Sequence, residues 1–293
     1  MTRNNHGDLV MLKPILCTIV LLMPIGLSAD MNINVPFLEK TPIIDGDLSE
    51  WKDRAHNDGL WDMRRIAETS FYTLDRGARN RLTIHGDEGH LSEDLSARYY
   101  IAWDDNNLYF GAEVHDNIND IEDPLSAEEF DGPVLYDSRW YFKDAICWFM
   151  EAPRDSANER FGQGDNAFCF TASPEQKPQN AWWRHGAPKQ NYIEEPIPAS
   201  SVDYAVKMNP WGQRKGDFIL EARVDLASTF GQSDPRWNAP QVGDEYSMEI
   251  VHTDPDGGNY GGHFMIYGNG DDDITWGRMI LVGPRDAIGR LTE

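Results

Sequence analysis

The sequence predicts an all-β protein, an antiparallel β-sandwich with long loop insertions. Short segments in which apolar and polar residues alternate recur along the chain, whereas helical periodicity is scarce. Turn-forming residues separate these segments, as in the hairpin turn expected at Asp104-Asp-Asn-Asn107. Many short strands joined by turns are typical of a sandwich or a barrel.

The clearest strands are expected at Leu108–His115 and Phe218–Asp225, where every second residue is apolar. In the first, the apolar face consists of Leu108, Phe110, Ala112 and Val114. Further strands of similar composition are expected at Pro36–Ile44, Ser96–Trp103, Ala145–Met150, Asn166–Ala172, Val202–Met208, Tyr246–Thr253 and Ile274–Val282.

Three connections between these strands exceed the usual loop length: Trp51–Leu95, Asn117–Lys143 and Ser173–Ser201. The first is expected to hold a short helix around Trp61–Ala67, and the third carries Trp182 and Trp183 among Pro and Gln residues. Long loops in a compact domain are usually functional or disordered. No internal repeat or low-complexity linker divides the chain, so residues 30–293 are expected to form one domain with a core at about 40–283.

Residues 1–29 resemble a signal peptide. A start with Arg3 and Lys13 precedes an apolar run from Pro14 to Leu27, and small residues follow at Ser28-Ala29. The run is shorter than the about 20 residues of a membrane-spanning helix, although an uncleaved anchor is the alternative. The sequence therefore predicts a secreted or periplasmic protein that is not bound to a membrane after cleavage.

The chain is strongly acidic, with a formal net charge of −23 over 293 residues. Loss of residues 1–29 would remove two basic residues and one acidic residue, which leaves −24. Such a surface repels nucleic acids and anionic lipids, since both require clustered Lys and Arg. It suits neutral partners and divalent cations, or a solvated surface with no ligand.

Several motifs together resemble the family 9 carbohydrate-binding modules. They are Ile43-Ile-Asp-Gly-Asp-Leu-Ser-Glu-Trp51, the hairpin from Tyr100 to Asp116, the Asp-led strand Asp144–Glu151, Leu220-Glu-Ala-Arg-Val224, and Trp276-Gly277 with Leu281. Each motif is weak alone, but their order and direction agree over most of residues 40–283. The resemblance implies a sandwich that binds carbohydrate and has no catalytic site, with carbohydrate-active enzymes as possible partners.

In that family, a sugar end lies between two aromatic rings, since the apolar C–H face of a pyranose stacks on a flat ring. Trp140, four residues before Asp144, corresponds to the first ring, and the alternative is an aromatic residue that caps the core. Tyr260 and Tyr267 are the candidates for the second, with Trp276 further along the chain. Trp182 and Trp183 are the expected contributors from the third loop.

The polar residues depart from the family pattern. Cys147 stands where the family has a sugar-binding Glu, Cys169 where it has an Arg, and His252 or its neighbour Val251 near a Gln. Cysteine is only a weak donor and acceptor, so the usual pocket is altered and sugar binding itself is put in doubt. Because the family's Glu and Arg are neighbours on adjacent strands, the resemblance implies that Cys147 and Cys169 are in contact or bonded. Two buried free thiols are the alternative.

Calcium is the expected cofactor, since the family often carries it and hard cations bind clustered oxygen atoms. Asp116, Asn119 and Asp120 form the preferred cluster, with Asn117 beside them. Asp254, Asp256, Asn259 and the run Asp271-Asp-Asp273 offer others. None has the spacing of an EF-hand loop, and solvated turn residues are the alternative for each.

Three other functions remain open. Relatives of this fold hold haem b, and Met150, Met208 and Met248 with His115 and His252 are the possible ligands, although Met on a strand is usually core. A β-sandwich that has a structural role or binds another protein would have no sugar site. Glycoside hydrolysis needs a pair of carboxyl groups that the sequence does not single out, and the motifs of common hydrolases are missing. The sequence therefore favours a binding protein over an enzyme.

Overall fold

A computed structural model of the 293-residue chain describes residues 32–62, 70–73, 95–119, 140, 143–155, 161–175, 180–187, 190–254, 262–268, 270 and 272–285. The expected signal peptide lies outside these ranges. Within them, no helix has the length and apolar character needed to cross a bilayer.

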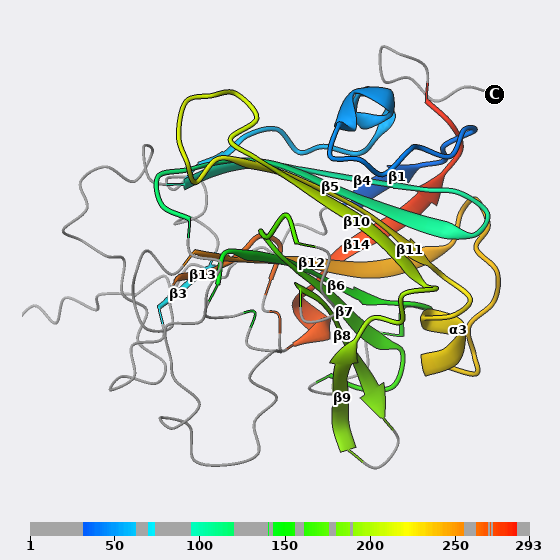
Figure 1. Ribbon diagram of the computed structural model, residues 1–293. Helices are drawn as coiled ribbons and strands as arrows, with labels where there is room; N and C mark the ends of the chain where they lie inside the picture. The colour runs from blue at the N-terminus through cyan, green and yellow to red at the C-terminus, as the bar shows by residue number, and fades with distance from the viewer. Residues whose placement is uncertain are drawn as a thin grey trace, which may run out of the picture.

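Two β-sheets stack face to face, which confirms the predicted all-β sandwich (Figure 1). The nine strands of the larger sheet are β1 (Asn32–Pro36), β3 (Ser70–Thr73), β6 (Ala145–Glu151), β7 (Asp165–Thr171), β8 (Ala181–Ala187), β9 (Gln190–Pro196), β12 (Glu245–Asp254), β13 (Gly262–Met265) and β14 (Gly277–Val282). The five strands of the smaller sheet are β2 (Trp61–Asp62), β4 (Leu95–Trp103), β5 (Asn107–Asp116), β10 (Val202–Met208) and β11 (Phe218–Asp225).

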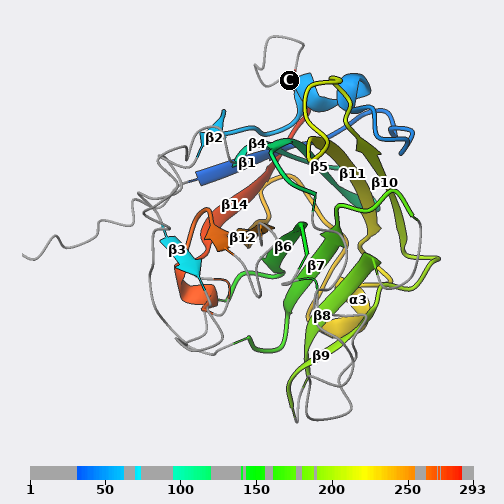
Figure 2. The ribbon, with the colours of Figure 1, turned by 60° about the vertical axis from the view of Figure 1, so that its left-hand side comes forward.

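The order of the larger sheet is β1-β14-β12-β6-β7-β8-β9, and β13 pairs with β12 and β3. Figure 2 shows this path, with β9 at the edge beside β8. The order of the smaller sheet is β10-β11-β5-β4-β2. The pairings among the described strands are antiparallel, except that β1 runs parallel to β14.

The inner faces of the two sheets form the main core. Leu108, Phe110, Ala112 and Val114 of β5 are fully buried there, as their alternation predicts. Phe110 stacks on Trp148 of the opposite sheet, with ring centroids 4.9 Å apart and an interplanar angle of 25°. Because each large aromatic ring removes roughly 200 Å² from water, such pairs contribute much of the hydrophobic stabilisation.

Most expected strands lie within one residue of their predicted ends, and β10 and β11 match completely. The strand expected at Pro36–Ile44 is an exception, because β1 ends at Pro36. The amides of Phe37 and Leu38 bond to Val282 O and Trp103 O, and the chain then leaves the sheet. Similarly, the segment expected to begin a strand at Ile274 is a 3₁₀ turn, η7 (Asp273–Thr275), and β14 begins at Gly277.

Two expected loops also differ. The connection Ser173–Ser201 contains the β8–β9 hairpin, so Trp182 and Trp183 belong to a strand. Where a helix was expected at Trp61–Ala67, Trp61–Asp62 forms β2 on the smaller sheet, while residues 63–67 lie outside the described part.

Residues 38–55, here called the N-terminal wrap, cover the outer face of the smaller sheet (Figure 1). The wrap includes the 3₁₀ turns η1 (Leu48–Glu50) and η2 (Lys52–Arg54), and its Trp51 packs against Tyr109 of β5. Glu221 of β11 anchors it: the amides of Asp45 and Gly46 donate to Glu221 Oε2 at 2.9 Å, and Trp51 Nε1 donates to Oε1 at 2.7 Å. The opening motif and the late strand are therefore joined by one buried carboxylate.

Candidate functional site

The outer face of the larger sheet, here called the outward face, is apolar at its centre. It is formed by residues that alternate with the core residues: Ala145, Cys147 and Phe149 of β6, Ala167 and Cys169 of β7, Trp182 of β8 and Val251 of β12. Trp140, Phe161 and Trp276 pack onto it from other segments. Burial of these side chains stabilises the face, so the residues that cover it decide what remains open to a ligand.

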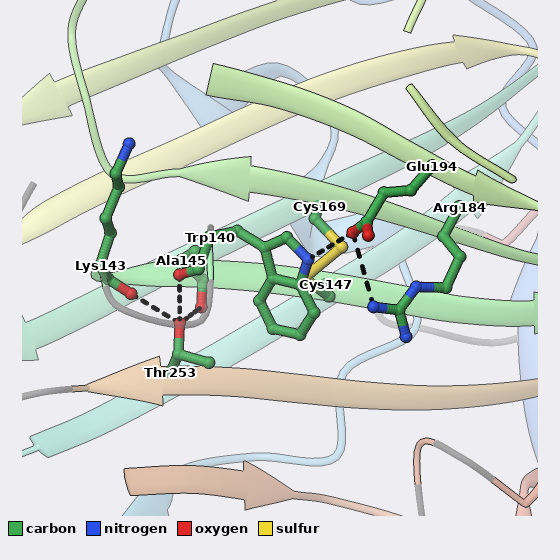
Figure 3. The surroundings of a disulfide bond; sticks show 8 residues. All are labelled: Trp140, Lys143, Ala145, Cys147, Cys169, Arg184, Glu194 and Thr253. Atoms are coloured by element: carbon green, nitrogen blue, oxygen red, sulfur yellow. Dashed lines mark hydrogen bonds and ion pairs between the residues drawn. A yellow bond between two sulfur atoms is a disulfide. The ribbon is translucent and has the colours of Figure 1, made fainter. Parts of the chain in front are cut away.

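A disulfide lies at the centre of this face. Cys147 and Cys169 are register partners in β6 and β7, and the structure joins them by a bond, the pairing that the resemblance implied (Figure 3). Both residues are buried. Because a disulfide donates no hydrogen bond, the centre of the face offers no directional contact to a sugar hydroxyl.

Trp140 lies against the disulfide and is buried (Figure 3). Only 5% of its surface is exposed. Its ring stacks on the imidazole of His263 at 5.9 Å between centroids, and its Nε1 donates to Glu194 Oε1 at 3.2 Å. The prediction of an open indole at this position is wrong, and the alternative of a core-capping aromatic describes the residue, because burial of the ring removes its large apolar surface from water.

Three other predicted sugar contacts are also buried. Trp182 is 2% exposed on the outward face, and Trp183 is 1% exposed in the main core, where its Nε1 donates to Asn166 Oδ1 at 2.9 Å. His252 lies in the core with Nδ1 2.7 Å from the hydroxyl of Tyr99, and burial lowers its pKa to about 3. Its imidazole is therefore neutral and out of reach of a ligand.

The two tyrosine candidates lie elsewhere. Tyr267 is half-buried, packs edge-on against Trp61 at 6.4 Å between centroids, and donates a hydrogen bond to Asp58. Tyr260 lies outside the described residues. Neither residue therefore places an open ring beside Trp140 in the described structure.

Sequence reasoning missed a polar cluster at the edge of the outward face, formed by Arg184 of β8 and by Tyr192 and Glu194 of β9. We call it the Arg–Glu–Tyr cluster. Arg184 and Glu194 are register partners with an ion-pair distance of 3.5 Å, and the guanidinium lies 4.4 Å from the centroid of the Tyr192 ring. Tyr192 is 42% exposed. The cluster thus combines an accessible aromatic ring with a cation and a carboxylate.

The cluster lies on β8 and β9, the two strands that follow the disulfide toward the edge of the sheet. Trp182 is the register partner of Cys169, and Arg184 follows it two residues later on the same face. The guanidinium and the carboxylate therefore lie beside the disulfide, toward the edge of the sheet.

Three aromatic rings form a wall beside this cluster. Phe149, Phe161 and Trp276 contact one another with centroid distances of 5.9–6.4 Å, and Phe161 also contacts Tyr192 at 5.9 Å. Phe161 has a φ of 61°, which is uncommon for a bulky residue, and its ring is buried. We call these three residues the aromatic wall.

Two triads of buried acidic side chains lie near opposite ends of β6. In the first, Asp116 at the end of β5, Asp144 before β6 and Asp254 at the end of β12 bring carboxylate oxygens within 4.8 Å of one another. The partners of Asp116 in this triad come from distant segments of the chain and are not the predicted Asn119 and Asp120. Asn119 is half-buried outside the triad, and Asp120 lies outside the described residues.

The second triad consists of Glu151, Asp165 and Asp273, again with carboxylate oxygens within 4.8 Å. Burial raises the pKa of Glu151 to about 7, of Asp165 to about 8 and of Asp273 to about 6. Neighbouring acids add to the effect, since like charges disfavour ionisation. Three hard oxygen donors in such proximity are the kind of arrangement that binds a divalent cation.

The possible haem ligands are dispersed. Met150 and Met248 are buried register partners in the main core. His115 lies near the end of β5, against Trp211 at 4.2 Å between centroids, and Met208 is at the end of β10. The buried methionines thus pack in the core, whereas His115 stacks on an aromatic ring near the surface.

Comparisons with known proteins agree on the fold. No protein-family profile and no curated protein matches the sequence. Two solved structures of a family 9 carbohydrate-binding module from Caldicellulosiruptor kristjanssonii, in complex with cellotriose and with glucose, are similar to this chain. Both structures are 16% identical to this chain, and each match covers 87% of it. The matches cover 95% of the cellotriose complex and 97% of the glucose complex, with TM-scores of 0.50 and 0.52, respectively.

A solved structure of a protein from Bacteroides uniformis ATCC 8492 is also similar. It is 9% identical to this chain, and the match covers 86% of this chain and 98% of the Bacteroides protein, with a TM-score of 0.50. At these identities the comparisons establish the architecture, and the site must be judged from its own residues.

Proposed function

We propose that this chain, which has the fold of the family 9 carbohydrate-binding modules, is a non-catalytic protein that binds a polysaccharide or glycan end. The observation that carries the proposal is the Arg–Glu–Tyr cluster, where the exposed ring of Tyr192 lies under the guanidinium of Arg184 and beside the carboxylate of Glu194. Support also comes from the similar modules of Caldicellulosiruptor kristjanssonii, which were solved with cellotriose and glucose.

The chemistry of the cluster suits a saccharide. A pyranose has an apolar C–H face that packs on an aromatic ring, and its equatorial hydroxyls both donate and accept hydrogen bonds. Glu194 supplies acceptors and Arg184 supplies donors at the side of the Tyr192 ring, so a sugar on this ring would meet both kinds of partner. Among the described residues, Trp140 covers the disulfide at the centre of the outward face, which favours the edge of the sheet as the position of the ligand.

The β8–β9 hairpin offers two matched pairs of variants. Tyr192 and Ile193 are neighbours with similar exposure, 42% and 39%, on opposite faces of β9. Glu194 contacts Arg184 on the outward face, whereas Glu195 contacts His185 on the other. Each pair therefore compares the same kind of change at adjacent positions, with only one member in the cluster.

We expect Tyr192→Ala and Glu194→Gln each to weaken binding about tenfold, because a stacked ring or a charged hydrogen bond contributes about 1–2 kcal/mol. Ile193→Ala and Glu195→Gln should stay within about twofold of the wild type, as surface changes outside a site do. The measurement is a glycan array followed by calorimetric titration with cellotriose or the best array ligand. Equal losses in both members of a pair, with melting temperatures unchanged, would refute the cluster as the site. No binding by the wild type would favour a structural or protein-interaction role.

We also propose that calcium binds the first acid triad, Asp116, Asp144 and Asp254. Their donors are the carboxylate oxygens that calcium prefers, and they come from both sheets, so a bound ion would tie the sheets together. We expect calcium to raise the melting temperature of the wild type and a chelator to reverse the rise. Asp254→Asn should reduce this response, and an equal response in the variant would contradict the assignment.

Export to the periplasm or the exterior is part of the proposal. The leader-like residues 1–29 support it, and a disulfide persists more readily in an oxidising compartment. There the protein would meet polysaccharides and the enzymes that degrade them, and such carbohydrate-active enzymes are the proposed partners.

A further inference from the structure

The second acid triad stands on the outward face, at the opposite end of β6 from Asp144. Glu151 ends β6 and Asp165 begins β7, and the two are register partners. Asp273 begins η7 and reaches the same point from the segment that precedes β14. All three side chains are buried, and their oxygens lie within 4.8 Å of one another. Three distant parts of the chain thus converge on one small volume.

One carboxylate of the triad is incompletely satisfied by hydrogen bonds. Asp273 is 2% exposed, and its Oδ1 has no hydrogen-bond partner among the described residues. A buried acceptor without a partner costs about 1–3 kcal/mol, and more when it is charged. Its position beside two further carboxylates points to a positively charged ligand rather than to a hydrogen-bond donor of the chain.

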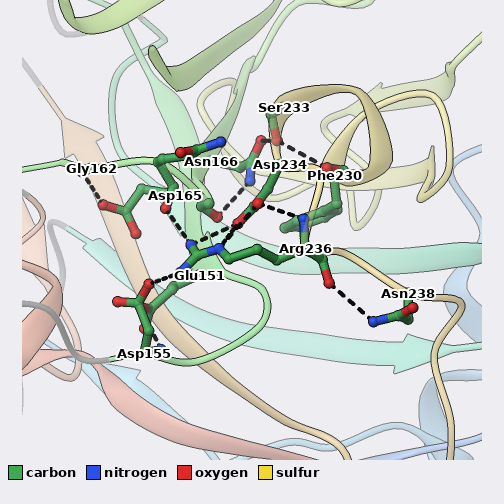
Figure 4. Close-up of polar contacts among 12 residues, drawn as sticks. Glu151, Asp155, Gly162, Asp165, Asn166, Phe230, Ser233, Asp234, Arg236 and Asn238 are labelled. Atoms are coloured by element: carbon green, nitrogen blue, oxygen red, sulfur yellow. Dashed lines mark hydrogen bonds and ion pairs between the residues drawn. The ribbon is translucent and has the colours of Figure 1, made fainter. Parts of the chain in front are cut away.

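Arg236, which pairs with Asp155 near the triad, is engaged by other acids. Arg236 donates to Asp234 at 2.7–2.8 Å and to Asp155 at 2.5 Å, which places its guanidinium between those two side chains (Figure 4). In the described residues, neither Asp165 nor Asp273 takes part in an ion pair. Buried carboxylates in such a cluster are stabilised when they coordinate a metal.

The same three segments carry the aromatic wall. Phe149 lies two residues before Glu151, Phe161 four residues before Asp165, and Trp276 three residues after Asp273. A ligand that joins the three acids would therefore also fix the relative positions of the three rings. This arrangement links a charged site to the shape of the neighbouring surface.

We propose that Glu151, Asp165 and Asp273 form a second site for a divalent cation of the size of calcium, which clamps the segments of the aromatic wall together. Carboxylates that act as monodentate or bidentate ligands suit calcium, whereas magnesium demands a stricter octahedral geometry. The inference stands on the triad alone and does not require that the protein bind sugar.

Asp273→Asn tests the site, with Asp272→Asn as the matched control. Both remove one acidic charge at adjacent positions, and only Asp273 belongs to the triad. Calorimetric titration with calcium chloride on metal-free protein should show that Asp273→Asn has lost one site, or binds calcium there about 100-fold more weakly. Asp272→Asn should bind as the wild type does. Asp254→Asn, which affects only the first triad, should retain the second site.

A second readout separates loss of the ligand from loss of the fold. In the absence of metal, Asp273→Asn should melt at or above the temperature of the wild type, because it removes one of three crowded carboxylates. In calcium, its rise in melting temperature should be smaller than that of Asp272→Asn. Identical calcium stoichiometry and affinity in the two variants would overturn the proposal. Equal stabilisation by magnesium would overturn the assignment of a calcium-sized ion.

Discussion

Replacing Glu221 with alanine is expected to lower the free energy of unfolding by about 4 kcal/mol. The substitution removes the acceptor of three donors: the amide of Gly46 and Nε1 of Trp51, which are buried, and the amide of Asp45, which is partly buried. The two buried donors cannot turn toward water while the N-terminal wrap stays in place, and all three donors would lose a bond to a charged group. Urea denaturation followed by tryptophan fluorescence measures the change.

The control is Glu113→Ala on the neighbouring strand β5. Glu113 also contacts the wrap, through Lys52 at 2.6 Å, and it accepts a hydrogen bond from Tyr100 at 2.7 Å. It is partly exposed, so water replaces its contacts and the expected loss is about 1 kcal/mol. If Glu221→Ala destabilised the protein no more than Glu113→Ala, the anchoring role of the buried carboxylate would be disproved.

Loss of the disulfide is expected to lower the free energy of unfolding by about 3 kcal/mol. Cys147 and Cys169 are 22 residues apart, and the bond restricts the loop between them in the unfolded chain. The double variant Cys147→Ala, Cys169→Ala avoids burying hydroxyl groups in an apolar face. Thermal or urea unfolding of the variant and of the wild type, each with and without dithiothreitol, gives the difference.

The wild type should become as unstable as the variant in reductant, whereas the variant should not respond to reductant. Thiol titration of the unfolded, unreduced full chain provides an independent count. One reactive thiol, that of Cys17, is expected, since the other two cysteines are bonded. Three reactive thiols would exclude the bond.

Alternation predicted the strands well wherever one face of a strand differs from the other in polarity. Phe218–Asp225 is such a strand, and its predicted and observed ends agree. The β8–β9 hairpin escaped prediction because β8 is apolar on both faces at its centre: Trp182 faces outward and Trp183 faces the core. Two adjacent tryptophans interrupt the alternation of apolar and polar residues that indicates a strand, and nearby Pro and Gln favour a loop.

The site was harder to predict than the fold. An exposed aromatic and a buried one have the same sequence signature, so Trp140 was placed at the surface although the disulfide, His263 and Glu194 enclose it. Arg184 and Glu194 meet only because a hairpin pairs them. Their contact could be found only after that hairpin had been recognised.

Both acid triads illustrate the same difficulty at longer range. Asp116 and Asp254 are more than a hundred residues apart in sequence, and so are Glu151 and Asp273. The sequence showed many acids and several local clusters, but it could not show which members converge. Sandwich topology, which returns distant strands to one edge, decides that outcome.

The N-terminal wrap has a consequence for how the protein would behave on a polymer. Of the two broad outer faces of the sandwich, the wrap occupies one, and the Arg–Glu–Tyr cluster borders the other. On the proposed function, and with one such site among the described residues, the molecule would be monovalent toward a polysaccharide. It would coat the chains without bridging them, so mixtures would stay clear where a two-sited lectin precipitates. Any gain in avidity would have to come from tethering several copies or from a fused neighbour.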